Sequence, residues 1–292
     1  MSAGERHEPS AQASSGTSVA LTGAEEQPAR ASWWLVLIGL PIGFASSLAG
    51  IGGGLFAGSL LHFRWHLDLR RATGTALVLV FATTTSATLT EALQPDSSLD
   101  LRLIGALVVG VAFGAGAGFA FSERVSERLL RALFAVVLLA ASLRILLAGG
   151  GDALARDPEL RLTLVDYLWA AAVGGAGGFV APVLGVGGGL IMVPGLFLGL
   201  PGLGFDAARA MSLATGSIGS LRSLVLKHRA GRVCWRHGLR LAAGALLGAA
   251  TGVTALGIDQ RWIEVGRVLL GVVLALVGLR FARDWMRDVT KV

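Results

Sequence analysis

Hydrophobic residues occur in eight long blocks separated by short polar segments. Six blocks have the length of a single membrane crossing, for which about 20 mostly apolar residues suffice. The other two are longer, and each contains a run of glycines. The blocks cover residues 33–62, 72–93, 101–121, 129–148, 166–199, 207–226, 238–257 and 262–282.

The two long blocks predict bent helices. A straight helix over residues 33–62 has a length of about 45 Å, whereas the hydrocarbon core of a bilayer is about 30 Å thick. Two full crossings need about 40 residues. The intermediate length therefore predicts two half-helices that enter and leave by the same face. The bends are expected at the glycine runs 50–54 and 185–189, because consecutive glycines destabilise a helix interior.

The two glycine runs belong to an internal duplication. The segment Asp68-x-x-Arg71-Ala72 follows the first run and recurs after the second as Asp206-x-x-Arg209-Ala210. Each half therefore reads as one broken block followed by three crossings. Two glycine series at four-residue spacing also recur, and such spacing is typical of close helix packing. These series are Gly110, Gly114, Gly118 and Gly244, Gly248, Gly252.

The positions of Lys and Arg predict the orientation in the membrane. The chain has 25 Lys and Arg against 19 Asp and Glu. These cations lie in the short loops, as the positive-inside rule requires, rather than on a face that binds nucleic acid. If both broken blocks return to their own side, most loop cations gather on one side of the membrane. If both blocks pass straight through, the split is more even. The hairpin arrangement places both termini in the cytoplasm and inverts the second half relative to the first.

The predicted fold is an all-α polytopic membrane protein of two inverted repeats. Each repeat consists of a broken re-entrant hairpin and three transmembrane helices. The first residues are polar and rich in Ser and Ala, which predicts a disordered cytoplasmic tail. The expected boundaries are 1–32 for this tail, 33–148 for the first repeat, 149–165 for a linker, 166–284 for the second repeat and 285–292 for a C-terminal cytoplasmic tail.

Composition excludes several classes of function. With 53% hydrophobic and 15% charged residues, the chain is too apolar for a soluble monomer. A single cysteine, Cys234, excludes an internal disulfide and a Cys-x-x-Cys pair. No Walker A loop precedes either lysine, and the interiors of the blocks lack the Asp or deep His that an intramembrane enzyme needs. We therefore expect no enzymatic activity, no catalytic residue, no metal site and no cofactor.

The glycine breaks are the first candidates for a binding site. A break inside a membrane leaves backbone N–H groups that lipid cannot satisfy. The helix that starts after each break also directs the positive end of its dipole toward it, which favours an oxyanion. The alternative is that these glycines only let helices pack closely. The candidate residues are Gly52, Gly53, Gly54, Gly187, Gly188 and Gly189.

Polar residues in the neighbouring blocks extend this candidate site. Hydroxyl groups of membrane helices often bond only the carbonyl one turn back, which is the alternative for each of them. Two arginines, Arg144 and Arg222, either extend toward the membrane interface or face the pathway. Arg222 is the stronger candidate of the two, since it follows a polar stretch and a guanidinium binds oxyanions in a bidentate manner. The additional candidates are Ser47, Thr73, Thr75, Ser212, Thr215 and Arg222.

The chain resembles the sulfite exporter TauE/SafE family, also called the toluenesulfonate uptake permease group. Members of this family look like bacterial inner-membrane carriers of sulfite, sulfonates and related anions. The first half departs from the second at Ser59, where the second half has Pro194. The motifs that carry the resemblance are Gly43-Phe44-x5-Gly50-Ile51-Gly52-Gly53-Gly54, its copy Gly178-Phe179-x5-Gly185-Val186-Gly187-Gly188-Gly189-Leu190-Ile191-Met192-Val193-Pro194, and the Asp-x-x-Arg-Ala segments.

Taken together, the residues and the resemblance predict a secondary transporter of a small sulfur-containing oxyanion in the bacterial inner membrane. The alternative is an anion channel or a membrane scaffold that transports nothing. Glu91 is the one weak candidate for a proton relay, so proton coupling and a passive or potential-driven pathway both stay open. The expected partners are the small anion and the lipid bilayer, without nucleic acid. The sequence leaves open which anion is moved, in which direction, and whether the chain forms a homodimer.

Overall fold

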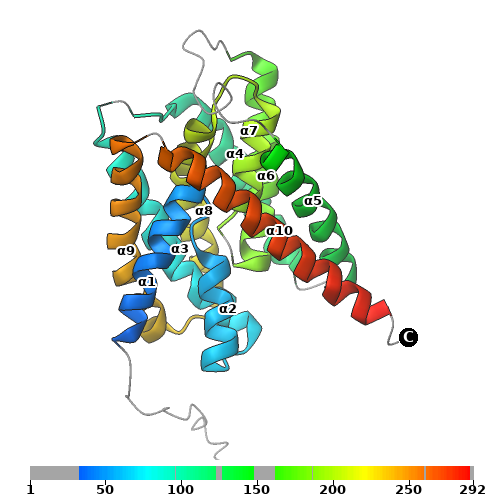
Figure 1. Cartoon of the computed structure of the whole chain (residues 1–292). Helices are drawn as coiled ribbons and strands as arrows, with labels where there is room; N and C mark the ends of the chain where they lie inside the picture. Colours follow the sequence, from blue (N-terminus) through cyan, green and yellow to red (C-terminus); the bar gives the residue numbers. More distant parts are fainter. Residues whose placement is uncertain are drawn as a thin grey trace, which may run out of the picture. The chain divides into compact units, whose positions relative to one another are not determined.

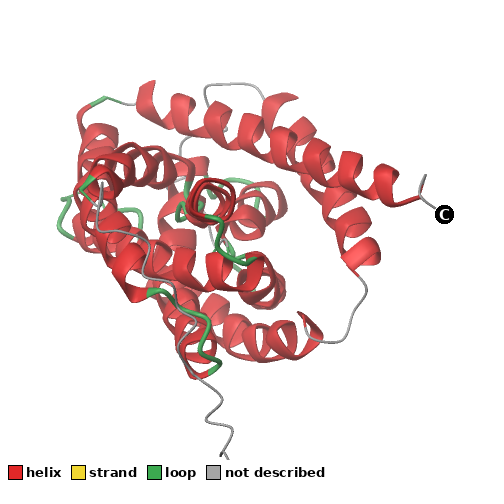
Figure 2. Cartoon of the chain, turned by 90° about the horizontal axis from the view of Figure 1, so that it is seen from below, coloured by secondary structure: helices red, strands yellow, loops and turns green. Residues whose placement is uncertain are grey.

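A computed structural model describes residues 33–95, 97–122, 127–147, 162–185, 187–259 and 261–289. Within these ranges the chain forms α-helices joined by short loops, and no strand is present there (Figure 2). The predicted N-terminal tail, most of the 149–165 linker and the side chain of Arg144 lie outside the described residues.

Ten helices are described, and they follow the predicted blocks closely (Figure 1). The first half contains α1 (Trp34–Ala49), α2 (Gly54–Trp65), α3 (Leu69–Ala92), α4 (Leu101–Ser122) and α5 (Glu127–Leu147). The second half contains α6 (Leu164–Leu184), α7 (Gly189–Gly199), α8 (Phe205–Arg229), α9 (Trp235–Ile258) and α10 (Arg261–Val289). The last helix continues past residue 284, where the sequence analysis placed the start of a tail.

Five of the described helices are long and apolar enough to cross a membrane. They include α3, α4, α6, α9 and α10. Helix α8 has 25 residues, more than enough for a crossing, yet it does not meet the same criterion of apolarity. The reason is its composition, because its buried face carries many hydroxyl groups and two cations.

Both long blocks are broken into antiparallel hairpins at the predicted glycines. In the first hairpin, Leu35 of α1 and Leu61 of α2 belong to one hydrophobic cluster. In the second, the indole N–H of Trp169 in α6 donates to the carbonyl of Gly195 in α7 at 3.0 Å. A Cβ at Gly199, at the end of α7, would collide with the Trp169 ring. The start and end of each hairpin therefore lie close together.

The second hairpin differs from the predicted pair of half-helices in one respect. Helix α1 has 16 residues, a length of about 24 Å, whereas α6 has 21 and is by itself long enough for a crossing. The additional residues of α6 lie at its start, before Trp169. The end of α7 packs against Trp169, so this first turn of α6 has no counterpart in α7. Its Thr163–Asp166 capping box stabilises this additional turn, since it satisfies N–H groups at the start of the helix.

The two glycine series join the halves to one another. A Cβ at Gly110, Gly114 or Gly118 of α4 would collide with a backbone carbonyl of α6. Gly244 and Gly248 of α9 face carbonyls of α1 in the same way. The packing predicted from the four-residue spacing is therefore present. In both cases the second of the three crossings that follow one half's break packs against the first helix of the other half, so the halves interlock.

The helix bundle has an upper and a lower end, named as they appear in Figure 1. At the upper end the loop after α3 reaches the start of α8, where the Ser98 hydroxyl donates to Asp206 at 2.8 Å. At the lower end the loop between α8 and α9 reaches the start of α3, where the Cys234 N–H donates to Thr75 Oγ1 at 2.9 Å. Helices α3 and α8 thus run in opposite directions.

Candidate functional site at the two glycine breaks

The two breaks have the same backbone conformation. Helix α1 ends at Gly50 with φ of 73°, and α2 begins after Gly53 with φ of 78°. In the second half the corresponding values are 69° at Gly185 and 79° at Gly188. Only glycine adopts this left-handed region without strain, so the repeated glycines are needed to stop one helix and start the next within a few residues.

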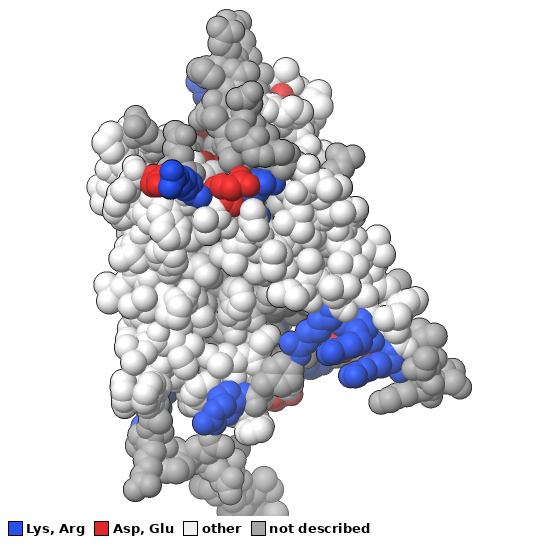
Figure 3. All heavy atoms as spheres, viewed as in Figure 1, with Lys and Arg blue, Asp and Glu red and all other residues white. Residues whose placement is uncertain are grey.

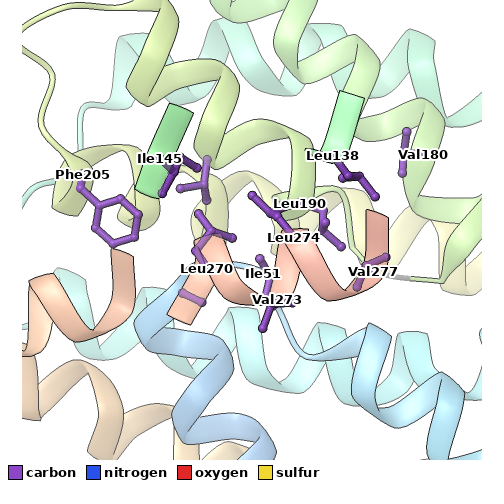
Figure 4. Packing of buried hydrophobic residues seen from close by; sticks show 12 residues of the cluster. Ile51, Leu138, Ile145, Val180, Leu190, Phe205, Leu270, Val273, Leu274 and Val277 are labelled. Carbon is purple, nitrogen blue, oxygen red and sulfur yellow. The ribbon is translucent and has the colours of Figure 1, made fainter. Parts of the chain in front are cut away.

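The two breaks lie against each other inside the protein. A Cβ at Gly189 would collide with the Gly50 carbonyl and lie 2.9 Å from Ile51 Cα. The Ser212 hydroxyl of α8 donates to that same Gly50 carbonyl at 3.1 Å. Figure 4 shows Ile51 and Leu190, one from each break, in one buried cluster with Leu274 of α10. The chain therefore brings together the two segments that the duplication identified.

Val80, near the middle of α3, lies between the breaks. Its side chain is close enough to block a Cβ at Gly52 or at Gly187. A Cβ at Gly216 of α8 would lie 3.6 Å from the Gly187 carbonyl and 3.4 Å from Thr84 Cγ2. The breaks thus meet near the midpoints of α3 and α8. The close approach there depends on glycines, because a side chain at Gly52 or Gly187 would collide with Val80.

Helices α2 and α7 begin at this meeting point. The first N–H groups of a helix lie before its first internal hydrogen bond, so they have no acceptor within the helix. In α7 the first such bonds run from Ile191 and Met192 to the Gly188 carbonyl at 3.0 and 3.1 Å. At α2 the first helical bond runs from Ala57 to the Gly53 carbonyl at 3.1 Å. The Ser46 hydroxyl is fully buried, lies beside Gly53, and has no hydrogen-bond partner among the described residues. Backbone donors and a buried hydroxyl therefore converge on the same place.

The predicted hydroxyl residues divide into two groups. Ser47, Thr73 and Thr75 bond carbonyls of their own helices at 2.9, 3.1 and 2.7 Å, which is the alternative stated for such residues. Ser212 and Thr215 behave differently. Ser212 bonds the first break, while Thr215 is fully buried and has no hydrogen-bond partner among the described residues. Their role in binding stays a prediction.

Arg222 is not near the breaks. Its side chain is exposed on α8, and its Nη2 lies 3.7 Å from the position that a Cβ at Gly116 of α4 would occupy. This position on the outer surface fits an arginine that extends toward the membrane interface.

A buried ion network lies directly above the first break, and the sequence analysis did not anticipate it. Arg209 is 1% exposed, and its guanidinium donates to Glu91 at 2.7 Å and to Asp206 at 2.7 and 3.0 Å. It also donates to the Ser47 carbonyl in the last turn of α1 at 3.4 Å. A cation at the C-terminal end of a helix is favourable, because that end carries partial negative charge. Arg209 therefore links α3, α8 and the end of α1.

The signal for this network was present in the sequence. Arg209 belongs to the repeated Asp-x-x-Arg-Ala segment, and Asp206 lies three residues before it, on the same face of the helix. What the pattern does not contain is Glu91, which is 118 positions away in the chain. Glu91 was interpreted as a candidate for a proton relay and not as the ion-pair partner of Arg209, so the sequence did not predict the network.

Comparison with known proteins agrees with this architecture. The family model described as sulfite exporter TauE/SafE matches residues 8–145 and 170–291, which is most of the chain. The chain belongs to the sulfite exporter TauE/SafE family. This TauE/SafE protein is therefore a multi-pass membrane transporter, as the sequence motifs indicated.

Two curated relatives support the same assignment. The chain is 26% identical over 266 residues to the probable membrane transporter protein YunE of Bacillus subtilis, with 84% of this chain and 94% of that protein covered. It is 24% identical over 210 residues to the probable membrane transporter protein MJ0441 of Methanocaldococcus jannaschii, with 68% and 74% covered. No solved structure matches the chain.

Proposed function

We propose that this TauE/SafE protein is a secondary transporter of a small sulfur-containing oxyanion, such as sulfite or a sulfonate, across the bacterial inner membrane. The anion binds to backbone amides at the two glycine breaks. The observation that carries the proposal is that two helix N-termini, at Gly54 and Gly189, begin at breaks that lie against each other. An oxyanion has several acceptor oxygens, which match several converging N–H donors.

The arrangement of the halves supports inverted repeats. The α1–α2 hairpin opens toward the lower end and the α6–α7 hairpin toward the upper end (Figure 1). The interlocking of α4 with α6 and of α9 with α1 is the reciprocal pairing that an in-plane pseudo-two-fold axis generates. In transporters built this way the substrate site lies near the midplane, at the interrupted helices. The breaks beside Val80 occupy that position.

Charge supports an orientation with the lower end in the cytoplasm. On the face drawn in Figure 3, charged residues form two bands separated by a wide uncharged zone, and the lower band is predominantly positive. At that end α8 finishes with Arg229, the connection to α9 contains Arg232, and Arg236 and Arg240 follow in α9. By the positive-inside rule this end is cytoplasmic, and so are both termini.

The buried charges favour transport that does not depend on a proton relay through Glu91. Its carboxylate already accepts a hydrogen bond from the Arg209 guanidinium at 2.7 Å, so it serves as a partner within a buried ion pair. Transport that is passive or driven by the membrane potential requires no such relay.

The experiment is anion flux into proteoliposomes that contain the purified protein. Sulfite, sulfate, thiosulfate and short sulfonates are tested separately, with and without a pH gradient. Gly53→Leu and Gly188→Leu should each abolish flux, because a side chain at either position requires a strained backbone and collides with residues that surround its own break, Ser46 at Gly53 and Gly177 at Gly188. Gly105→Leu is the matched control, since Gly105 is exposed on α4 and a Cβ there meets nothing within 4 Å.

A milder variant keeps the test independent of folding. Ser46→Ala removes a buried hydroxyl that bonds no described residue, so no hydrogen bond within the described part of the chain is lost. We expect an increase of about tenfold in KM for the transported anion, equivalent to about 1.4 kcal/mol of binding. Wild-type flux of these anions that both glycine variants leave unchanged would refute the site. Flux far above carrier rates would favour a channel, and no flux of any anion a scaffold.

A further inference from the structure

The lower half of α8 has a buried face that is almost entirely polar or small. Buried positions recur there every three or four residues, which places them along one side of the helix. Leu224 is the apolar exception. The other members, in order from the breaks toward the lower end, are Thr215, Gly216, Gly219, Ser220, Ser223 and Lys227.

This face is enclosed by helices and not exposed to lipid. A Cβ at Gly216 would contact Thr84 of α3 at 3.4 Å, and one at Gly219 would lie 3.0 Å from Val111 Cγ1 of α4. Farther down, Lys227 packs between the same two helices. A Cβ at Gly74 of α3 would lie 3.5 Å from Lys227 Cβ, and the Lys227 ammonium lies 5.9 Å from the centroid of the Phe119 ring of α4.

Two hydroxyl groups on this face have no hydrogen-bond partner among the described residues. They belong to Thr215 and Ser223, and both side chains are fully buried. Buried polar groups are nearly always hydrogen-bonded, because leaving them unpaired is unfavourable. Ser220 on the same face does bond a backbone carbonyl, that of Ser217, at 3.1 Å. The two unpartnered hydroxyls therefore lack even the usual bond within the helix.

Lys227 adds a positive charge where this face ends. It is 5% exposed, and lysine is rarely buried because removing its ammonium from water is costly. Toward the lower end, this face of α8 therefore presents two hydroxyls without described partners and then the Lys227 side chain.

We infer that this face of α8 lines the inner half of the anion pathway, from Thr215 beside the breaks to Lys227 at the cytoplasmic mouth. The inference rests on the proposed transport of an oxyanion. Thr215 and Ser223 donate hydrogen bonds to the passing anion, and Lys227 raises the local concentration of anions at the inner mouth. Helices α3 and α4 form the opposite walls.

The first test uses the accessibility of introduced cysteines. The chain contains one cysteine, so Cys234→Ser supplies a background without a reactive thiol. In that background, Ser223→Cys should react with an anionic methanethiosulfonate reagent added from the cytoplasmic side. Modification should reduce flux at least tenfold, and a saturating concentration of the transported anion should slow the labelling severalfold. The extent of labelling is read by mass spectrometry.

Ser142→Cys is the matched control for this labelling. Ser142 is also buried, at 3% exposure, but its hydroxyl donates to the Gly271 carbonyl at 2.8 Å and lies between α5 and α10. It should react much more slowly, and the anion should not change its rate. If Ser223→Cys labels no faster than Ser142→Cys, or if the anion does not protect it, the inner pathway is refuted.

The second test concerns Lys227 and compares anion entry from the cytoplasmic side of the membrane with entry from the opposite side. Lys227→Gln should raise KM for flux from the cytoplasmic side about tenfold and leave KM from the opposite side within a factor of two. Lys227→Arg should restore the cytoplasmic KM. Arg229→Gln removes an exposed cation from the same end and should change KM less than twofold. Equal changes from both sides, or from both Gln variants, would contradict the role of Lys227.

These outcomes are distinguishable from failure of the proposed function. If wild-type protein moves none of the sulfur-containing anions, the transport proposal is wrong and the pathway falls with it. If wild-type protein transports one of them and Gly53→Leu abolishes this flux, while the Ser223 and Lys227 variants behave like their controls, only the inner pathway is wrong.

Discussion

The two copies of Asp-x-x-Arg-Ala have the same sequence pattern and opposite surroundings. In the second half, Arg209 is 1% exposed and bonded to two carboxylates. In the first half, Asp68 and Arg71 are both exposed. The duplication thus reproduces the backbone pattern, since in both halves a helix starts soon after the hairpin. Whether the arginine of that helix is buried depends on the side chains of the helix packed against it.

The opposite helix explains the difference. At the upper end, α3 presents Glu91 to Arg209. When the two Asp-x-x-Arg-Ala segments are aligned, the position in α8 that corresponds to Glu91 is Arg229. A cation there cannot neutralise Arg71, and an unpaired guanidinium is not buried at reasonable cost. Arg71 is accordingly exposed at the surface of the protein.

The largest difference in stability between the two halves is expected on substitution of Arg209 and Arg71. Arg209→Gln leaves the buried carboxylate of Glu91 without its partner, and we expect a loss of about 3–5 kcal/mol in stability. Arg71→Gln removes an exposed cation and should change stability by less than about 0.5 kcal/mol. Thermal unfolding of the two variants in detergent measures the difference. The double variant Arg209→Gln with Glu91→Gln should recover part of the loss, and equal melting temperatures for both single variants would contradict the comparison.

A smaller effect is expected from alanine at one glycine in each half. Gly189→Ala places a methyl group against the Gly50 carbonyl, so we expect it to destabilise the protein by about 1–3 kcal/mol. Gly58→Ala in α2 places its methyl group 3.7 Å from Ala76 Cβ, an ordinary contact. Because alanine is the better helix former, Gly58→Ala should be neutral or stabilising by up to about 1 kcal/mol. If both substitutions were tolerated equally, the breaks would not be in close contact.

The smallest effect concerns two hydroxyls that follow the repeated segment. Ser212 bonds the Gly50 carbonyl of the other half, whereas Thr73 bonds the Arg70 carbonyl of its own helix. Ser212→Ala should cost about 1 kcal/mol, since it leaves the carbonyl with one partner fewer. Thr73→Val should cost less, because a bond within the helix adds little to its stability. Melting curves recorded side by side would decide, and the opposite order would count against the contact between the halves.

Much of the fold could be predicted from local sequence. The crossings follow from apolar blocks of sufficient length, and the two bends from glycine runs that no helix tolerates well. The hairpins were expected because the blocks are too long for one crossing and too short for two. Even the packing of α4 and α9 through Gly110 and Gly244 was visible, since four-residue glycine spacing creates a flat helix face by itself.

The candidate site was only partly predictable, for a physical reason. A glycine run changes the backbone wherever it occurs, so its position in the chain is sufficient to identify it. Whether a polar side chain is satisfied depends on its neighbours in space. Thr75 and Thr215 both looked like pathway hydroxyls, yet Thr75 bonds backbone groups on two segments and Thr215 bonds none of the described ones.

The sequence by itself determined the membrane class, the duplication and the location of the two breaks, because each follows from the composition of a continuous segment. Only the tertiary structure decided which charges are buried and paired. Arg209 meets Glu91 across 118 positions of chain, and Lys227 lies against α4. Such pairs arise when helices from different halves pack together, and the free energy of a buried charge is set by those distant neighbours rather than by the residues beside it in sequence.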